Sequence, residues 1–321
     1  MRRRKRGVGA VSLHRLLGFR AAVPDPTALD SYYRELGLRG DATSGYTGSD
    51  GGAAVTVDES PFRRLLSVDV GCHDGRDLDA IDARLVAGGA SVRRTDDSVS
   101  VTDPASQVVL TVRVAEPEAA LPSPQPVTYN SPGGIVRRNE RAPGALAGPR
   151  PPRRLGHLVI GTPDLPATRD LLATGLGCRL SDEVEGFVAF LRCSTEHHNI
   201  GLVHSPVPLL QHYAWECDDV DHLGHTATAL YRADPARHSW GFGRHFAGSN
   251  FYWYLRDPAG SFIELYADLD RIDDDEAWRT NAGELDFDHI ANVWGPNLPT
   301  EFVEPDDLPQ LEQAWAGLDA R

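Results

Sequence analysis

Cysteine is scarce in this chain, which has only four in 321 residues. No two of the four are separated by just two residues, so the sequence predicts neither a structural zinc site of Cys-x-x-Cys pairs nor a disulfide framework. The four indicate buried thiols in a reducing compartment: Cys72, Cys178, Cys193 and Cys217. We therefore expect a cytoplasmic protein.

Long apolar runs and an excess of positive charge are also absent. No stretch approaches the roughly 18 apolar residues that a membrane-spanning helix requires. The basic residues 2–6 precede a segment that His14 and Arg15 interrupt, so we do not expect a secretory signal. With 32 basic against 46 acidic residues the formal net charge is −14, which argues against binding nucleic acid through its phosphates. We expect neither a membrane nor a nucleic acid as a partner.

The chain does have a globular composition and two similar halves. Hydrophobic residues make up 41% and charged residues 24% of the sequence, which is enough to bury a full core. Residues 117–154 are crowded with Pro, Gly and Arg, which predicts a linker. The sequence thus predicts five parts, which are a basic N-terminal segment (1–12), a first domain (13–116), this linker (117–154), a second domain (155–299) and a tail (300–321).

The two halves can be laid over each other element by element. Each begins with a strand and a helix that ends at a glycine, and Asp25 and Asp164 are placed to cap the two helices. Each continues with an alternating strand and an amphipathic helix, and each closes on a hairpin whose turn begins with Asp-Pro, at Asp103 and Asp257. This order predicts an α+β protein of two homologous domains, in which paired βαβββ modules form a curved sheet around a cleft.

Polar side chains in three predicted strands of the second half are candidates for a metal site. Nine of the twelve histidines lie between His157 and His245. His157 and His212 lie in alternating strands, and Glu264 is a charge among apolar neighbours. A buried carboxylate is costly unless something positive compensates it, and a divalent metal would do so. Taken singly, each histidine could be a hydrogen-bonded core residue, and the glutamate could face water.

The overlay favours the metal site over these separate explanations. It places His157 on Gly18, His212 on Ser67 and Glu264 on Leu110. The three polar groups are thus present together in one half and absent from the other, whereas a scaffold that needed them for packing should have kept at least one. Two imidazoles and one carboxylate form a facial triad with open coordination positions, the ligand set of non-haem Fe(II) oxygen chemistry that Mn(II) can also occupy.

The segment from Gly243 to Glu264 carries the most specific pattern. With the rest of the chain, from about Leu13 to Pro299, it resembles the type I extradiol ring-cleaving dioxygenases of the vicinal oxygen chelate superfamily, which include 2,3-dihydroxybiphenyl and catechol 2,3-dioxygenases. The resemblance implies a glyoxalase-like fold. It also implies that His157, His212 and Glu264 hold the metal, with Fe(II) expected first and Mn(II) as the alternative.

The resemblance further implies three groups that act on and bind the substrate. His197 matches the acid/base histidine, and His198 replaces it if the alignment slips by one position. His245 matches a histidine that forms a hydrogen bond in the pocket, and Tyr254 matches a tyrosine that contacts a substrate hydroxyl beside the metal. The alternatives are a solvated His197–His198 pair, a structural His245 and a Tyr254 that merely fills the sheet.

The register of the last hairpin decides whether Tyr254 can act beside Glu264. If Arg256 pairs with Phe262, Tyr254 and Glu264 face each other, and a slip of one residue turns them to opposite faces. Both registers are compatible with the sequence. The extradiol interpretation requires the first.

The predicted function is extradiol cleavage of a catechol-type diol by dioxygen, giving a yellow ring-opened semialdehyde. No arginine clamp for a carboxylated catechol is evident, which favours a neutral or bulky diol. The resemblance implies a homo-oligomer, and the tail, residues 286–296 and 308–315, either closes over the site or packs outside it. Two other functions stay open: another metal-dependent enzyme of the superfamily, such as an isomerase, hydrolase or antibiotic-modifying enzyme, and a protein that binds a small aromatic or a drug without turnover.

Overall fold

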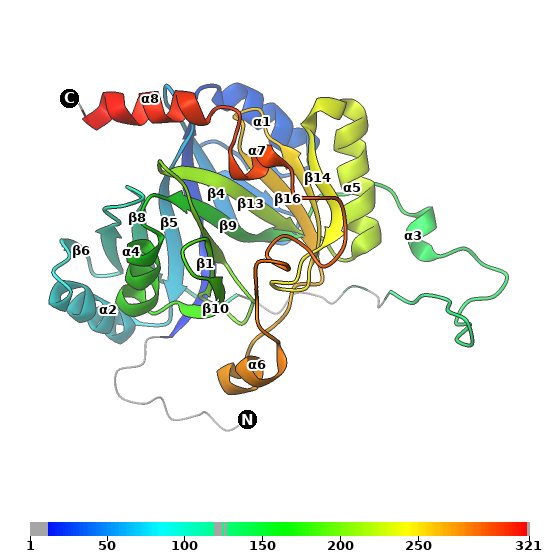
Figure 1. Ribbon diagram of the computed structural model, residues 1–321, viewed down its shortest axis with the longest axis horizontal. Helices are drawn as coiled ribbons and strands as arrows, with labels where there is room; N and C mark the ends of the chain where they lie inside the picture. The colour runs from blue at the N-terminus through cyan, green and yellow to red at the C-terminus, as the bar shows by residue number, and fades with distance from the viewer. Residues whose placement is uncertain (1–11, 119–123, 125–126, 320–321) are drawn as a thin grey trace.

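Two eight-stranded sheets, one from each half, form the core of the computed structural model, which describes residues 12–118, 124 and 127–319 (Figure 1). The first half contains β1 (Leu13–Val23), β2 (Arg39–Asp41), β3 (Gly45–Gly48), β4 (Gly51–Glu59), β5 (Arg64–Cys72), β6 (Val92–Arg94), β7 (Ser98–Thr102) and β8 (Val109–Val114). The second half contains β9 (Arg154–Thr162), β10 (Arg179–Val184), β11 (Val188–Arg192), β12 (Ile200–His204), β13 (Leu209–Glu216), β14 (His238–Arg244), β15 (Phe251–Arg256) and β16 (Phe262–Ala267). The predicted basic segment 1–12 lies outside the described residues, apart from Ser12.

The two sheets have the same topology. Their strand orders are β2-β3-β4-β1-β5-β8-β7-β6 and β10-β11-β12-β9-β13-β16-β15-β14. In each half the first strand is parallel to the fourth and antiparallel to the fifth, and the fifth is parallel to the eighth. The predicted α+β fold of two homologous halves is therefore confirmed.

Helices connect the strands of each half. They are α1 (Pro26–Glu35) and α2 (Gly75–Ala87) in the first half, and α4 (Leu165–Asp170), the wider-wound η1 (Leu171–Leu176), α5 (Val220–Ala233) and the short turn η2 (Pro235–Arg237) in the second. The predicted caps are confirmed, because Asp25 accepts a hydrogen bond from the backbone N–H of Ala28 and Asp164 accepts one from that of Ala167. No helix among the described residues is long and apolar enough to span a membrane.

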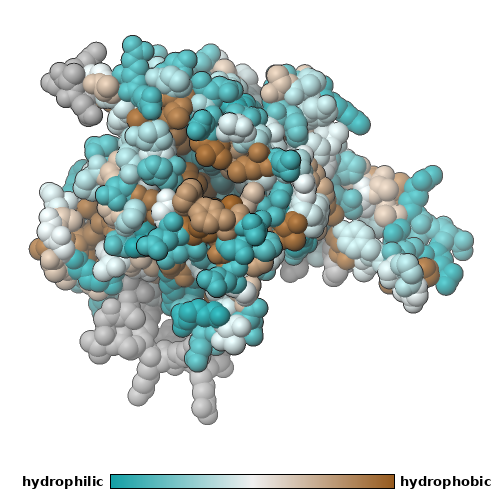
Figure 2. Space-filling view, in the orientation of Figure 1, coloured by the Kyte–Doolittle hydropathy of each residue, from teal (hydrophilic) through white to brown (hydrophobic). Residues whose placement is uncertain are grey.

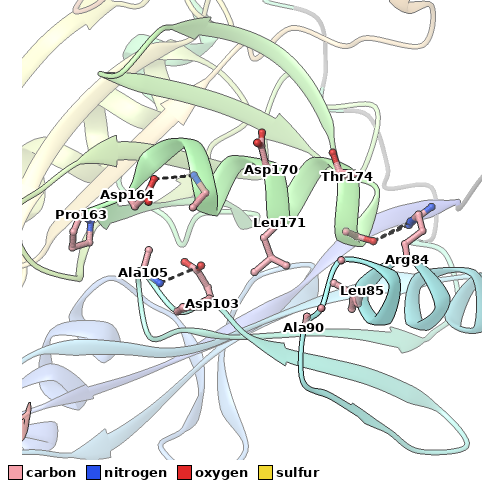
Figure 3. A pocket seen from close by; sticks show the side chains of 15 residues that line it. Arg84, Leu85, Ala90, Asp103, Ala105, Pro163, Asp164, Asp170, Leu171 and Thr174 are labelled. Carbon is pink, nitrogen blue, oxygen red and sulfur yellow. Dashed lines mark hydrogen bonds between the residues drawn. The ribbon is translucent and has the colours of Figure 1, made fainter.

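The two halves share one hydrophobic core and a buried chain of hydroxyl groups. Tyr33 of α1 donates to the hydroxyl of Tyr213 on β13 at 2.9 Å, and Tyr213 donates to the carboxylate of Asp257 at 2.9 Å. Along another part of the seam, the guanidinium of Arg84 on α2 donates to the carbonyl oxygen of Gly175 on η1. Figure 3 shows the open cleft beside this contact, where the turn that begins at Asp103 faces α4 and η1.

The strand registers confirm two of the three overlaid pairs and correct the third. In the second half, His157 pairs with Ala214 and His212 pairs with Phe262. At the matching places of the first half, Gly18 pairs with Asp69 and Ser67 pairs with Val109. Glu264, however, corresponds to Thr111 and not to Leu110, so that part of the prediction was wrong.

The cause is a turn that is one residue longer in the first half. Asp103 donates its backbone N–H to the carbonyl of Val108, five residues on, whereas Asp257 donates to Ser261, four residues on. The first turn accommodates its additional residue with Gln107 in the left-handed region, at φ 59°.

The linker and the tail lie against both halves. In the linker, α3 (Pro143–Leu146) accepts a hydrogen bond from His225 of α5 at the carbonyl of Gly144, and the carbonyl of Pro152 accepts one from Ser49 of the first half. After β16 the chain forms α6 (Asp275–Asn281), within the predicted second domain, and then α7 (Thr300–Val303) and α8 (Leu308–Asp319) in the tail, and α8 lies at the edge of the molecule (Figure 1). Before α8 begins, Arg63 of the first half forms a two-bond ion pair with Asp307.

Candidate metal centre

The three predicted metal ligands come from three neighbouring strands in the middle of the second sheet. His157 on β9 and Glu264 on β16 lie on either side of Ala214 of β13, and His212 is two residues before Ala214 on the same strand. Because side chains two residues apart in a strand point to the same face, all three converge. Their ligand atoms lie within 4.8 Å of one another, and all three residues are buried.

The charges at this centre suit a divalent metal. Burial lowers the pKa of His212 to about 3, so its imidazole is neutral at neutral pH. Burial opposes the ionisation of Glu264, but the neighbouring histidines, His157 first, hold its pKa below the ordinary value. Nε2 of His157 lies 2.9 Å and Nε2 of His212 lies 3.6 Å from Oε2 of Glu264. A neutral imidazole, as at His212, and an ionised carboxylate, as at Glu264, are the forms in which such residues bind metals.

Hydrogen bonds orient two of the three ligands. Nδ1 of His212 donates to the amide oxygen of Gln211, whose NH₂ group donates to the backbone carbonyl of Phe302 at 2.9 Å. This leaves Nε2 of His212 with its lone pair toward the centre. The NH₂ group of Asn250 donates to Oε1 of Glu264 at 2.9 Å. Sequence reasoning missed Gln211 and Asn250; their positions, beside a ligand and within the specific segment 243–264, were the only available signals.

Two buried polar atoms of the described residues around this centre lack a hydrogen-bond partner. Nδ1 of His157 and Oδ1 of Asn250 are buried and have no hydrogen-bond partner in the described part of the chain. Both belong to residues whose other polar atom, Nε2 of His157 and Nδ2 of Asn250, contacts Glu264. The fit to a divalent metal rests on the donor set, two imidazole nitrogens and one carboxylate oxygen within 4.8 Å of one another.

Tyr254 and His245 form a hydrogen-bonded pair beside the carboxylate. Arg256 pairs with Phe262 and Tyr254 pairs with Glu264, so the hairpin register required for the extradiol interpretation is confirmed. Nδ1 of His245 lies 2.6 Å from the backbone carbonyl of Ala291, which can only accept, so this nitrogen carries the proton. Nε2 of His245, 3.0 Å from the hydroxyl of Tyr254, then accepts from it. Burial raises the pKa of Tyr254 well above its ordinary value and lowers that of His245.

The structure brings His198, and not His197, to the cavity. The ring of His198 lines the cavity and lies 4.2 Å, centre to centre, from the ring of His157. His197 is fully buried behind it, with Nε2 2.8 Å from Asp182 and Nδ1 3.0 Å from Nδ1 of His198. His198, the alternative in the sequence analysis, is therefore the histidine beside the ligands. Sequence reasoning missed Asp182, which lies on β10, fifteen residues before His197.

The cavity has a volume of about 270 Å³, and its walls are mainly apolar. Strand residues line one side, and the chain after β16 supplies the other with Ile290, Ala291, Leu298, Phe302, Val303 and Pro305. Among the described residues, the lining contains no Lys or Arg. In Figure 2, hydrophobic residues gather around a hollow near the centre of the visible face.

The two expectations for the tail apply to different parts of it. Ile290 and Ala291 belong to residues 286–296, and both contact the cavity. The α8 helix instead packs outside, where the ring of Trp315 lies 5.5 Å from that of Phe62 and its N–H donates to the carbonyl of Pro208.

Sequence comparisons connect the chain to proteins of known activity. Residues 154–265 match the Glyoxalase/Bleomycin resistance protein/Dioxygenase superfamily. The chain is 34% identical over 257 residues to metapyrocatechase 2 of Cupriavidus necator, a match that covers 76% of each protein. It is 27% identical over 125 residues to the manganese-dependent 2,3-dihydroxybiphenyl 1,2-dioxygenase of Geobacillus genomosp. 3, covering 36% of this chain and 40% of that protein.

Solved structures show the same fold. Homoprotocatechuate 2,3-dioxygenase of Brevibacterium fuscum, in complex with 3,4-dihydroxyphenylacetate, superposes with a TM-score of 0.70 at 18% identity and covers 93% of this chain and 94% of its own. The Mn(II)-bound glyoxalase of Novosphingobium aromaticivorans gives a TM-score of 0.64 at 22% identity, covering 82% and 85%. At these identities the likeness establishes the architecture alone.

Proposed function

Because the chain belongs to the extradiol ring-cleaving dioxygenases of the Glyoxalase/Bleomycin resistance protein/Dioxygenase superfamily, we propose that His157, His212 and Glu264 hold the metal at which it works. The reaction is the extradiol cleavage of a catechol-type diol by dioxygen, and it depends on a non-haem metal. We propose Fe(II) as that metal, since two histidines and one carboxylate are typical of non-haem iron oxygenases, with Mn(II) accepted by the same ligands. The convergence of the three ligand atoms within 4.8 Å is the observation that carries this proposal.

The bound metal would supply two things: it lowers the pKa of a coordinated diol hydroxyl, and it brings the diol and dioxygen together. The residues of the chain then handle the protons. Tyr254 donates its own proton toward Nε2 of His245, so its oxygen is free to accept a hydrogen bond from the second diol hydroxyl. Proton transfer along this pair would assist the second deprotonation, a contribution typically on the order of 10²- to 10⁴-fold in rate.

We assign a second acid/base role to His198, whose ring lies beside that of His157. Its Nδ1 is engaged by His197, so Nε2 is the nitrogen that remains for a ligand in the cavity. From there His198 can accept a proton from a bound reactant and return it to the product. The apolar walls keep water from competing for the reacting groups.

The substrate we propose is a diol whose ring substituent is neutral and apolar. A carboxylate on that substituent would be buried against walls that offer no Lys or Arg among the described residues. Burying an unpaired charge is costly, whereas an alkyl or aryl group gains from the apolar surface. Neutral diols such as 4-methylcatechol and 2,3-dihydroxybiphenyl should therefore exceed 3,4-dihydroxyphenylacetate in kcat/KM by at least about tenfold.

The two alternative functions are less well supported. A protein that binds an aromatic molecule without turnover does not require its histidines and carboxylate to converge, yet here they do. An isomerase or hydrolase of the superfamily has no need of the Tyr254–His245 pair and His198 grouped around the same three ligands. We also propose that the halves are domains with the predicted bounds, that the chain forms a homo-oligomer and that it is cytoplasmic, the last because all four thiols are buried and free.

The test is reconstitution. The purified chain is loaded anaerobically with Fe(II) or with Mn(II), mixed with catechol or 2,3-dihydroxybiphenyl in air, and followed by the absorbance of the yellow ring-opened product. His212→Ala should lose both bound metal and product, and the matched variant Ser67→Ala, at the equivalent position of the first half, should keep both. Turnover by His212→Ala at the rate of the parent chain would refute the assigned ligand.

A further inference from the structure

A carboxylate and two histidines form a continuous hydrogen-bonded chain that ends at the cavity. Asp182 on β10 lies 2.8 Å from Nε2 of His197, and Nδ1 of His197 lies 3.0 Å from Nδ1 of His198. His197 and His198 precede β12 and come from a different part of the sheet from Asp182. Only the last of the three residues contacts the cavity, so the first two act on it only through His198.

His197 is held in place on every side. Its backbone N–H donates to the carbonyl of Asp270 at 2.9 Å, and its own carbonyl accepts from the hydroxyl of Ser181 at 2.6 Å. The ring is fully buried and packs against Trp278 of α6, with 5.3 Å between the ring centres. A residue fixed in this way cannot turn toward the cavity, but it can fix the residue next to it.

The chain of hydrogen bonds determines where each proton lies. A carboxylate only accepts, so Nε2 of His197 carries a proton in its bond to Asp182. In the neutral ring, Nδ1 of His197 is then an acceptor, and Nδ1 of His198 must be the donor to it. The remaining nitrogen of His198, Nε2, is left without a proton. The lone pair of Nε2 is therefore available to a ligand in the cavity.

We propose that His197 and Asp182 are positioning residues, which hold His198 in the tautomer whose unprotonated Nε2 is available to the substrate. The proposal rests on the proposed function, because it assigns to His198 the acid/base role in the ring cleavage. It goes beyond that function by naming two residues that never touch the substrate and yet set the state in which His198 meets it. A carboxylate that orients a histidine through its far nitrogen is an established way to fix a tautomer, and here it works through one additional ring.

Two variants of His197 separate this role from simple packing. The side-chain oxygen of Asn can take the place of Nδ1 and accept the bond from His198, whereas Leu fills a similar space and accepts nothing. His197→Asn should keep kcat within about threefold of the parent chain, and His197→Leu should lower it by about 10²-fold, the size of a lost acid/base contribution. KM and metal content should change in neither. Equal losses in the two variants, or no loss in either, would overturn the proposal.

Asp182→Asn provides a second test through the same chain of bonds. The amide of the introduced Asn can donate to Nε2 of His197, so the proton of His197 moves to Nδ1. Nδ1 of His197 then donates to Nδ1 of His198 instead of accepting from it. We expect a fall in kcat of about 10²-fold in the parent chain and no further fall when His197→Asn is already present. An additive fall in the double variant would contradict the coupling.

Imidazole nitrogen shifts test the tautomer without any turnover. In the full-length chain labelled with ¹⁵N-histidine and loaded with diamagnetic Zn(II), His198 should show a protonated Nδ1 and an unprotonated Nε2, and Asp182→Asn should reverse the two. The opposite tautomer in the parent chain would overturn the proposal even if ring cleavage is confirmed. Conversely, absence of ring cleavage by the parent chain would refute the proposed function and leave this measurement standing as its own test.

Discussion

In the second half, β9, β13 and β16 place His157, His212 and Glu264 around one point, while the equivalent strands of the first half, β1, β5 and β8, carry Gly18, Ser67 and Thr111 there. The strand order, the parallel and antiparallel pairs and the Asp-Pro turns are the same in both halves. The difference shows that this sheet does not need the polar triad for its stability. A role in chemistry explains why the triad occurs in one half only.

The first half also differs in how its residues at these positions are held. The hydroxyl of Thr111 is bonded to that of Ser100 at 3.1 Å, where the second half sets Glu264 opposite Tyr254. Gly18 has a φ of 142°, and a Cβ added to it would overlap the carbonyl oxygen of Ala54. A histidine at position 18 therefore requires a shift of the backbone, so we do not expect exchange of the three residues alone to create a metal centre in the first half.

Removing the carboxylate should have the largest effect on activity. A matched change in the first half should have none. Glu264→Gln keeps the shape of the side chain but removes the charge that the metal needs, so metal content should fall and kcat/KM should drop by at least about 10³-fold, the equivalent of several kcal/mol. Thr111→Val, at the equivalent position, should keep both values. Metal analysis and initial rates on the two variants check this, and a metal-replete, active Glu264→Gln would remove the basis of the comparison.

Installing a ligand in the first half should destabilise the chain and create no second site. Gly18→His requires a side chain at a positive φ against the backbone of Ala54, so we expect a loss in the free energy of unfolding of about 3 kcal/mol. Ser67→His, on a partly buried position of β5, should cost less than half of that. Urea unfolding of both variants measures the difference. A stable Gly18→His that binds a second metal ion would break the distinction between the halves.

The tail should affect substrate binding in the second half without affecting the metal. The ring of Phe302 lies 4.8 Å from those of Tyr254 and Phe262, so Phe302→Ala should raise KM by about tenfold, the loss of part of a buried aromatic contact, at unchanged metal content. Phe62→Ala is the matched control, since Phe62 packs on α8 outside the cavity. Steady-state kinetics with 2,3-dihydroxybiphenyl provides the measurement. An equal rise in KM in the two variants would assign the effect to the tail as a whole.

The smallest predicted effect concerns the seam between the halves. Burial raises the pKa of Asp257 from 3.8 to about 6. Because the folded-state pKa lies above the unfolded one, this group's contribution to stability is complete below pH 3.8 and is lost as the pH rises through 6. Asp257 alone should therefore lower the free energy of unfolding by about 1 kcal/mol between pH 5 and pH 7.

Urea titrations at the two pH values, on the parent chain and on Asp257→Asn, isolate this contribution. The variant should show a correspondingly smaller change between pH 5 and pH 7. The same pH dependence in both proteins would show that Asp257 is not the group responsible.

Sequence alone predicted the fold and the three residues that the structure brings together, whereas it left the hairpin register open. The repeat made this possible, because Asp-Pro turns and capped helices recur at matching places and the three polar residues have no counterpart. The errors came from features that a linear overlay does not contain. The additional residue beside Gln107 moved the counterpart of Glu264 from Leu110 to Thr111, since a turn's length depends on backbone conformation.

The choice between His197 and His198 could not be made from the sequence either. Adjacent residues in a loop point in different directions, and which of them faces the cavity is set by contacts with distant residues such as Asp182 and Trp278. Asn250 and Gln211 were missed for a similar reason, because a side chain that orients a ligand is recognised only once the ligand is placed. The cytoplasmic location, the oligomeric state and the identity of the metal stay predictions.

The central claim is that the second half alone binds a metal, and a crystal structure of the Fe(II)- or Mn(II)-loaded chain tests it most directly. Anomalous diffraction at the metal edge should show one ion per chain, bonded to His157, His212 and Glu264 at roughly 2.0–2.2 Å, the usual range for imidazole and carboxylate ligands of such metals. The equivalent position in the first half should show no ion. A metal bound elsewhere, or bound without one of these three side chains, would contradict the account.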